Sequence, residues 1–137
     1  MALDPNRYQL VIIDMQEKLA GAMPEAARVR GQRAAENLVF AARELDLPIT
    51  FTEQYPQGLG PTLASLGAAD PFVKTAFAAT DEPGFAPCLH PGRTFVLAGM
   101  ETHICVAHTA MGLRAAGHEV VVVPDACVSR RDDDWRD

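Results

Sequence analysis

The stretch VLAGMETHICVAHTA, residues 96–110, passes from a strand pattern to a helix pattern without a linker. It begins as an apolar run, breaks at Gly99, and continues through Thr102 and His103 to Cys105, which precedes an alanine-rich segment. A strand that leads directly into a helix is the repeating unit of α/β proteins. The pattern therefore places a thiol in the first turn of a helix, just beyond the carboxyl end of a strand.

The rest of the chain repeats this alternation. Short apolar runs predict five strands, at residues 8–14, 48–54, 72–74, 93–100 and 119–127. Helical composition and apolar stripes predict two long helices, at residues 24–47 and 103–118. The segments 55–67 and 81–90 indicate loops with short helical turns, whereas the polar segment 129–137 shows no clear element.

Strands that alternate with helices indicate an α/β fold with a mainly parallel sheet. The crossovers should be right-handed, which places helices on both faces of the sheet. We therefore expect a three-layer α/β/α domain with five strands. The whole chain, residues 1–137, should form one domain.

Composition and charge exclude several classes of protein. The 137 residues are 48% apolar and 22% charged, with a net charge of −6. An acidic chain without a basic cluster does not favour nucleic acid or an anionic membrane as a partner. No run of about 18 apolar residues predicts a membrane span, and the N-terminus does not resemble a signal peptide. Three widely spaced cysteines fit a reducing compartment, so we expect a cytoplasmic protein.

Three reactive side chains lie at or just past the carboxyl ends of three predicted strands, on the side of the sheet where ligands bind. Each has a simpler interpretation when taken alone. Asp14 could be a turn residue, Lys74 a side chain reaching solvent from the sheet edge, and Cys105 a small buried apolar group. Together they form a carboxylate, a cation and a thiol at a helix N-terminus, a position that favours thiolate. This combination predicts nucleophilic catalysis.

The same segments resemble the isochorismatase-like cysteine hydrolases, a family with a Rossmann-like fold that includes nicotinamidases and N-carbamoyl amidases. The resemblance covers nearly the whole chain and rests on several segments in the family's order. These are VIIDMQEKL (11–19), FVKTAFAA (72–79), LAGMETHICVAHTA (97–110) and AAGHEVVVVPDACVSR (115–130).

The resemblance implies a role for each reactive residue. Cys105 would be the nucleophile, Asp14 would accept its proton and pass it to the leaving group, and Lys74 would hold the carboxylate and stabilise thiolate. A cis peptide bond would join Met100 to Glu101. The backbone N–H groups of Glu101 and Cys105 would then bind the oxyanion.

The implied reaction is hydrolysis of a C–N bond in a small amide-type substrate, through a thioester. The resemblance implies no cofactor and a homo-oligomer. FTEQYPQGLGPT (51–62) contains no histidine, which does not favour the metal site of nicotinamidases, so we expect no metal. TEQYPQGLGPT (52–62) resembles a subgroup whose natural substrates are generally unassigned, and the sequence does not identify the substrate here.

Four further residues are candidates for the substrate pocket: Glu53, Gln54, Phe77 and His103. Glu53 and Gln54 could equally cap the following loop, and Phe77 could be a core residue. The family chain continues past its fifth strand with a helix, a sixth strand and a closing helix. We therefore expect the last strand and the C-terminal helix to be missing here, which leaves the edge of the fifth strand open.

Two other functions stay open. A binding or scaffold module of the same fold would lack turnover and have a thiol of ordinary pKa. A redox-sensing protein would oxidise Cys105 and need Cys127 or Cys88 as its resolving partner. The hydrolase interpretation is preferred because the base, the cation and the segment that would bind the oxyanion are all present.

Overall fold

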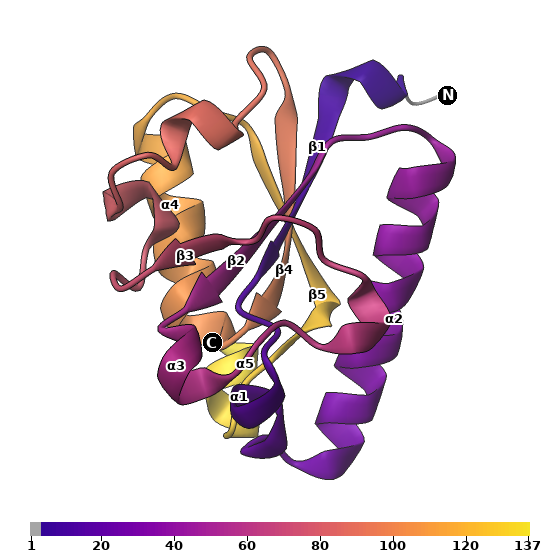
Figure 1. Cartoon of the computed structure of the whole chain (residues 1–137), viewed down its shortest axis with the longest axis vertical. Helices are drawn as coiled ribbons and strands as arrows, with labels where there is room; N and C mark the ends of the chain where they lie inside the picture. The colour runs from indigo at the N-terminus through magenta and orange to yellow at the C-terminus, as the bar shows by residue number, and fades with distance from the viewer. Residues whose placement is uncertain (1–3) are drawn as a thin grey trace.

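A parallel five-stranded sheet runs through the middle of the molecule (Figure 1). The computed structural model describes residues 4–137, with strands β1 Tyr8–Ile13, β2 Ile49–Gln54, β3 Phe72–Lys74, β4 Thr94–Met100 and β5 Val120–Val128. Their order across the sheet is β3-β2-β1-β4-β5, so β1 lies at the centre. The five predicted strands are all present and the parallel arrangement is confirmed.

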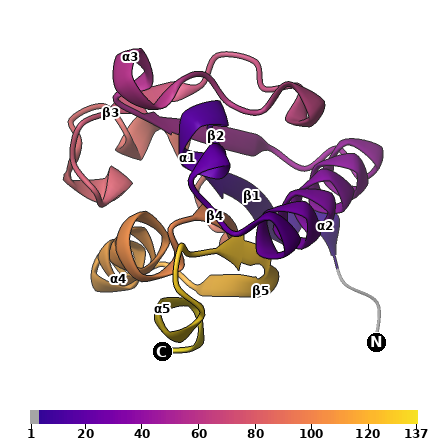
Figure 2. The same cartoon turned by 90° about the horizontal axis from the view of Figure 1, so that it is seen from below.

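Helices cover both faces of this sheet. The long helix α2, Glu25–Glu44, lies on one face, and α4, Ala107–Ala115, lies on the other (Figures 1 and 2). Three short helices lie at the lower end of the molecule in Figure 1, where the strands end: α1 Glu17–Gly21, α3 Pro56–Leu59 and α5 Asp132–Arg136. The predicted three-layer α/β/α architecture is therefore confirmed.

The central strand β1 contributes side chains to two separate cores. Leu10 and Ile12 belong to the core beneath α2, whereas Val11 and Ile13 belong to the core on the α4 side. Successive side chains of a strand point to opposite faces. Because helices cover both faces, the strand is apolar without a polar alternation, as buried parallel strands usually are.

A stripe of small residues holds α2 close to the sheet. Its buried residues are Gly31, Ala35, Val39 and Ala42, at the spacing of one helix face. A side chain at Gly31 would collide with Val128 of β5, because the Val128 methyl group occupies that space. This close packing fixes the end of β5, and the residues directly after β5 contact the candidate site.

The polar end of the chain forms the short helix α5, so the expectation of no element there is wrong. Its first turn carries Asp132, Asp133 and Asp134, and negative charge is favourable at a helix N-terminus. Trp135 donates its indole N–H to the carbonyl oxygen of Pro124, at 3.0 Å. Trp135 also packs against the core on the α4 side, and a single apolar residue produces no apolar stripe in the sequence.

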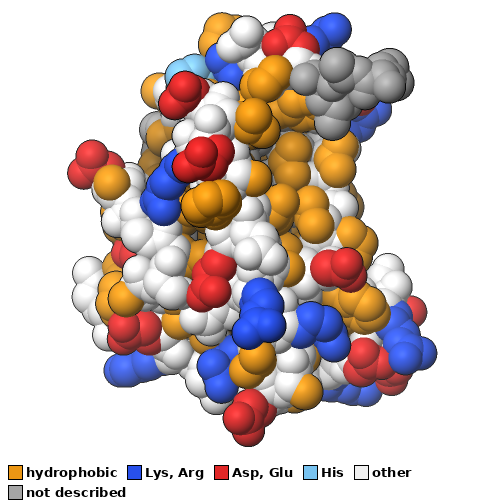
Figure 3. Space-filling model, turned by 90° about the vertical axis from the view of Figure 1, so that its right-hand side faces the viewer, with side chains coloured by type: hydrophobic (Ala, Val, Ile, Leu, Met, Phe, Trp, Pro, Cys, Tyr) orange, Lys and Arg blue, Asp and Glu red, His pale blue; other side chains and the backbone are white. Residues whose placement is uncertain are grey.

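An apolar groove of about 450 Å³ lies between α2 and the outer part of the sheet. Its lining includes Leu38 of α2 and Leu45, the residue after that helix, with Val96 and Val121 of the sheet. Figure 3 faces the α2 side and shows hydrophobic side chains gathered in the upper half of this face.

Within residues 4–137, β5 pairs only with β4. None of the helices in these residues is long and apolar enough to cross a membrane.

Candidate active site

A fully buried carboxylate lies directly beyond β1. Asp14 has a backbone φ of 53°, in the left-handed region that is uncommon for residues other than glycine. Its N–H donates to the carbonyl oxygen of Thr52 at 3.1 Å, and its Oδ1 accepts from the Thr52 hydroxyl at 2.7 Å. The left-handed backbone of Asp14 costs about 1–2 kcal/mol. These contacts hold the carboxylate in one orientation inside the protein.

Lys74, at the end of β3, supplies the matching positive charge. Its Nζ donates to Asp14 Oδ2 at 2.9 Å, and both side chains are fully buried. Three more oxygens surround Nζ: Gln54 Oε1 at 2.7 Å and the carbonyls of Ala76 and Phe77, each at 3.0 Å. A buried charge requires a partner and hydrogen bonds, and this cluster supplies both.

Cys105 completes the cluster from the other side of β1. It is 6% exposed and lies in a wide helical turn, Thr102–Val106, that joins β4 to α4. The pKa of its thiol is raised to about 12, mainly by burial and further by the charge of Asp14 and a hydrogen bond with that carboxylate. Lys74 acts in the opposite direction but is weaker than these causes.

The expectation that the helix N-terminus favours thiolate is therefore wrong for the resting protein. That reasoning assumed a partly exposed thiol in a regular first turn. The thiol is buried beside a carboxylate, and both features favour the neutral form. The resting group is a thiol next to a carboxylate that can accept its proton.

Gly99 brings the end of β4 close to β1. It pairs with Ile13 in the sheet and has a φ of 144°. A side chain at this position would collide with the Ile13 carbonyl oxygen, so only glycine fits. The chain then passes through a cis peptide bond between Met100 and Glu101, the bond that the resemblance implied. This route carries Cys105 to the carboxylate.

The residues directly after β5 contact the segment that follows the cis bond. Glu101 is 4% exposed, and its carboxylate accepts hydrogen bonds from the backbone N–H of Arg130 at 3.0 Å and from Arg130 Nε at 3.1 Å. The N–H of Thr102 donates to Ser129 Oγ at 3.1 Å. The sequence reasoning missed these contacts. Their only signal was the Ser-Arg pair at the end of the fifth predicted strand.

The four predicted pocket residues have different surroundings. Gln54 touches the cluster directly, because its Oε1 accepts from Lys74. Phe77 contributes its carbonyl to Lys74, and the residue is 57% exposed, so it is not a core residue. Glu53 accepts two hydrogen bonds from Thr62, both of 2.8 Å, and so holds the loop after β2. Any contact of these side chains with substrate stays a prediction.

His103 faces the β5–α5 corner. Its Nδ1 lies 3.2 Å from Ser129 Oγ, and its Nε2 lies 3.7 Å from Asp134 Oδ2.

In the part of the chain that the structure describes, no group of three or more His, Cys, Asp or Glu side chains could hold a metal ion.

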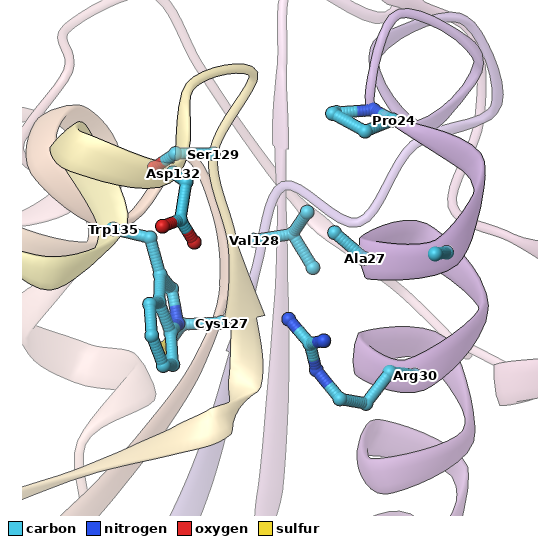
Figure 4. A pocket seen from close by; sticks show the side chains of 9 residues that line it. Pro24, Ala27, Arg30, Cys127, Val128, Ser129, Asp132 and Trp135 are labelled. Atoms are coloured by element: carbon cyan, nitrogen blue, oxygen red, sulfur yellow. The ribbon is translucent and has the colours of Figure 1, made fainter.

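A separate cavity of about 230 Å³ lies between α2 and the β5–α5 corner. Figure 4 shows Arg30 reaching in from α2, opposite Trp135 and Asp132 of α5. The guanidinium carbon of Arg30 lies 5.8 Å from the centre of the Trp135 ring. Asp14, Lys74 and Cys105 are not among the residues that line it, so this cavity lies outside the cluster.

Comparison with known proteins places this geometry in context. The family model for the Isochorismatase domain matches residues 8–137. Isochorismatase domain-containing protein 2 of Xenopus laevis is 40% identical over 131 residues, covering 88% of this chain and 60% of that protein. The chain thus spans about three fifths of that relative's length.

Two solved structures share the fold. The MAR1 ribonuclease of Caenorhabditis elegans is 33% identical, with a TM-score of 0.88 over 99% of this chain and 72% of that one. YcaC of Escherichia coli, described as an octameric hydrolase of unknown specificity, is 23% identical. Its TM-score is 0.81, over 98% of this chain and 70% of that one. This second likeness supports the fold alone.

Proposed function

The chain belongs to the Isochorismatase domain family, and from this premise we propose that it is a cysteine hydrolase that cleaves a C–N bond of a small amide-type substrate. The observation that carries the proposal is the buried cluster at the carboxyl ends of the strands. It combines a thiol, a carboxylate that can accept its proton, and a lysine that compensates the carboxylate charge. This is the arrangement needed for an activated nucleophile.

In the first step the Cys105 sulfur attacks the substrate carbonyl carbon. Because the resting thiol is neutral, its proton passes to Asp14 as the S–C bond forms. The carbonyl π electrons move to the oxygen. The backbone N–H groups of Glu101 and Cys105 donate to this oxyanion, and removal of one such donor typically lowers turnover by about 10²–10³.

In the second step the tetrahedral intermediate collapses. The C–N bond breaks, Asp14 returns its proton to the leaving nitrogen, and a thioester to Cys105 remains. Water then attacks the thioester while Asp14 accepts a proton from it. Collapse of the second intermediate breaks the C–S bond, releases a carboxylic acid, and returns the proton to the sulfur.

Lys74 supports each of these proton transfers. Its ammonium group lies 2.9 Å from Asp14 Oδ2, and three other oxygens hold it there. When Asp14 takes a proton, the lysine stabilises the negative charge that develops on sulfur and oxygen. Gln54 acts through Lys74 as a positioning residue.

Other activities fit these observations less well. Ribonuclease is the description of the Caenorhabditis elegans protein, but the net charge of −6 does not favour an RNA backbone. Redox sensing requires a reactive thiolate, whereas burial raises the pKa of both Cys105 and Cys127. A binding module of the same fold would keep the cluster and lack turnover.

We further propose a homo-oligomeric, cytoplasmic protein acting on a small molecule without a cofactor.

The test is a panel of simple aliphatic amides, nicotinamide and N-carbamoyl amino acids, with ammonia release coupled to glutamate dehydrogenase. A labelled RNA oligonucleotide is included as the competing substrate. Cys105→Ala should abolish ammonia release, whereas Cys88→Ala, a half-buried thiol outside the cluster, should retain it. Turnover that survives in Cys105→Ala, or RNA cleavage without amide cleavage, overturns the proposal.

A further inference from the structure

The chain directly after β5 forms a clasp on the segment that leads to Cys105. We use the word clasp for Ser129 and Arg130 together with their partners Glu101 and Thr102. Arg130 binds the Glu101 carboxylate through its backbone N–H, its Nε and its Nη2, at 3.0, 3.1 and 3.0 Å. Ser129 accepts from the Thr102 N–H at 3.1 Å. The two residues that directly follow β5 therefore hold two successive residues of the segment.

The buried Glu101 carboxylate depends on this contact, because removal of its partner would leave a buried charge uncompensated. The Glu101 side chain is 5% exposed, and a buried carboxylate without partners carries a large desolvation cost. Arg130 engages both oxygens: its Nε and Nη2 contact Oε1, and its backbone N–H donates to Oε2. The Arg130 side chain is itself 59% exposed, so it approaches from the solvent side.

We propose that Arg130 and Ser129 are positioning residues that fix the Glu101 N–H in place as an oxyanion donor. The proposal rests on the proposed function, because it assigns the clasp a role in the attack on a carbonyl. The Glu101 side chain and N–H belong to one residue, so a carboxylate anchored on Arg130 fixes the donor as well. A donor displaced by about 1 Å can reduce the rate about 100-fold.

Two probes of the same thiol separate positioning from structural support. p-Nitrophenyl acetate is attacked at its carbonyl, forms an oxyanion, and releases p-nitrophenolate as the acetyl group moves to sulfur. Iodoacetamide is attacked at its methylene carbon, releases iodide, and forms no carbonyl oxyanion. Loss of a positioned donor should slow acylation and leave alkylation unchanged, whereas a disrupted site slows both reactions.

The experiment measures both rates on the full chain with Arg130→Met, Arg130→Lys and Ser129→Ala. Arg131→Met is the matched control, because Arg131 is 75% exposed and lies 4.0 Å from its only carboxylate neighbour, Asp133, within the described residues. We expect Arg130→Met to lower the acylation rate by about 10- to 100-fold at an unchanged alkylation rate. Arg130→Lys should restore part of the loss, and Arg131→Met should change neither rate.

Equal rates of acylation in Arg130→Met and the unsubstituted protein overturn the proposal, and so does a parallel loss of both reactions. Failure of the proposed function has a different signature. It appears in the unsubstituted protein as alkylation without acylation, or as acylation that persists in Cys105→Ala. Ser129→Ala reports the second contact of the clasp separately and should reduce acylation less, because it breaks no ion pair.

Discussion

Replacement of Asp14 by asparagine should make Cys105 more reactive toward an alkylating agent while turnover is lost. Asparagine keeps the shape of the side chain and tolerates a left-handed backbone, so φ of 53° can be maintained. The charge of Asp14 and its hydrogen bond are two of the causes that raise the pKa of Cys105 to about 12. The substitution removes the charge and leaves Lys74, which lowers that pKa.

The expected size follows from the ionised fraction of the thiol. At pH 8, a thiol with a pKa of about 12 is thiolate in about one molecule in 10⁴. Each unit by which the pKa falls gives about tenfold more thiolate. Thiolate nucleophilicity declines with a Brønsted coefficient of about 0.4–0.5, so alkylation accelerates by about threefold per unit. Loss of the general base should meanwhile reduce turnover by about 10²–10⁴.

The assay is iodoacetamide labelling of Cys105 between about pH 6 and 10, followed by intact mass and peptide mapping. Asp46→Asn is the matched control, because Asp46 is exposed and has a similar φ of 57°. Slower labelling in Asp14→Asn than in the unsubstituted protein would refute the reasoning. That result would mean that the carboxylate activates the thiol in the resting state.

Three other changes have distinct expected outcomes. Gly99→Ala should lower the free energy of unfolding in urea by more than about 2 kcal/mol, because the alanine methyl group would meet the β1 backbone. Gly92→Ala is the control: open space surrounds this position, so the substitution should lower the free energy of unfolding by about 1 kcal/mol. Lys74→Met should cost about 3–5 kcal/mol by leaving the Asp14 charge buried alone, and adding Asp14→Asn should recover part of this. Hydrogen bonds from two backbone N–H groups lower the pKa of Glu82 below 4.5, so its contribution to stability is present above pH 4.5 and is lost as the pH falls through the lowered pKa. Glu82→Gln should therefore flatten the acid side of a thermal unfolding profile, and an unchanged profile would contradict this.

Much of the fold follows from local patterns, because buried parallel strands are short apolar runs. The rule that ligands bind at the carboxyl ends of parallel strands also selected Asp14 and Lys74, and the structure brings these side chains to 2.9 Å. Their roles in catalysis stay predictions. The patterns identify which residues lie at that end of the sheet and leave open how deeply each is buried.

The features that the sequence reasoning missed depend on distance and burial. The pKa of Cys105 is raised because the thiol is buried beside a charge that lies far from it in the chain, and no local pattern reports this. The contact of Glu101 with Arg130 joins positions 29 apart, and it depends on the register between β4 and β5. The helix α5 was missed because it has no apolar stripe. Trp135 anchors it through an indole hydrogen bond, which leaves no periodic pattern in the sequence.

The strand order has a consequence for synthesis on the ribosome. Among the described strands β1 emerges first, and β2 can pair with one of its edges soon afterwards. Its other edge belongs to β4, so it stays open until Thr94–Met100 has been made. An apolar strand with an open edge is an aggregation hazard in a nascent chain. Because Cys105 follows β4 in the chain, its thiol can reach the Asp14 carboxylate only after β4 has been made.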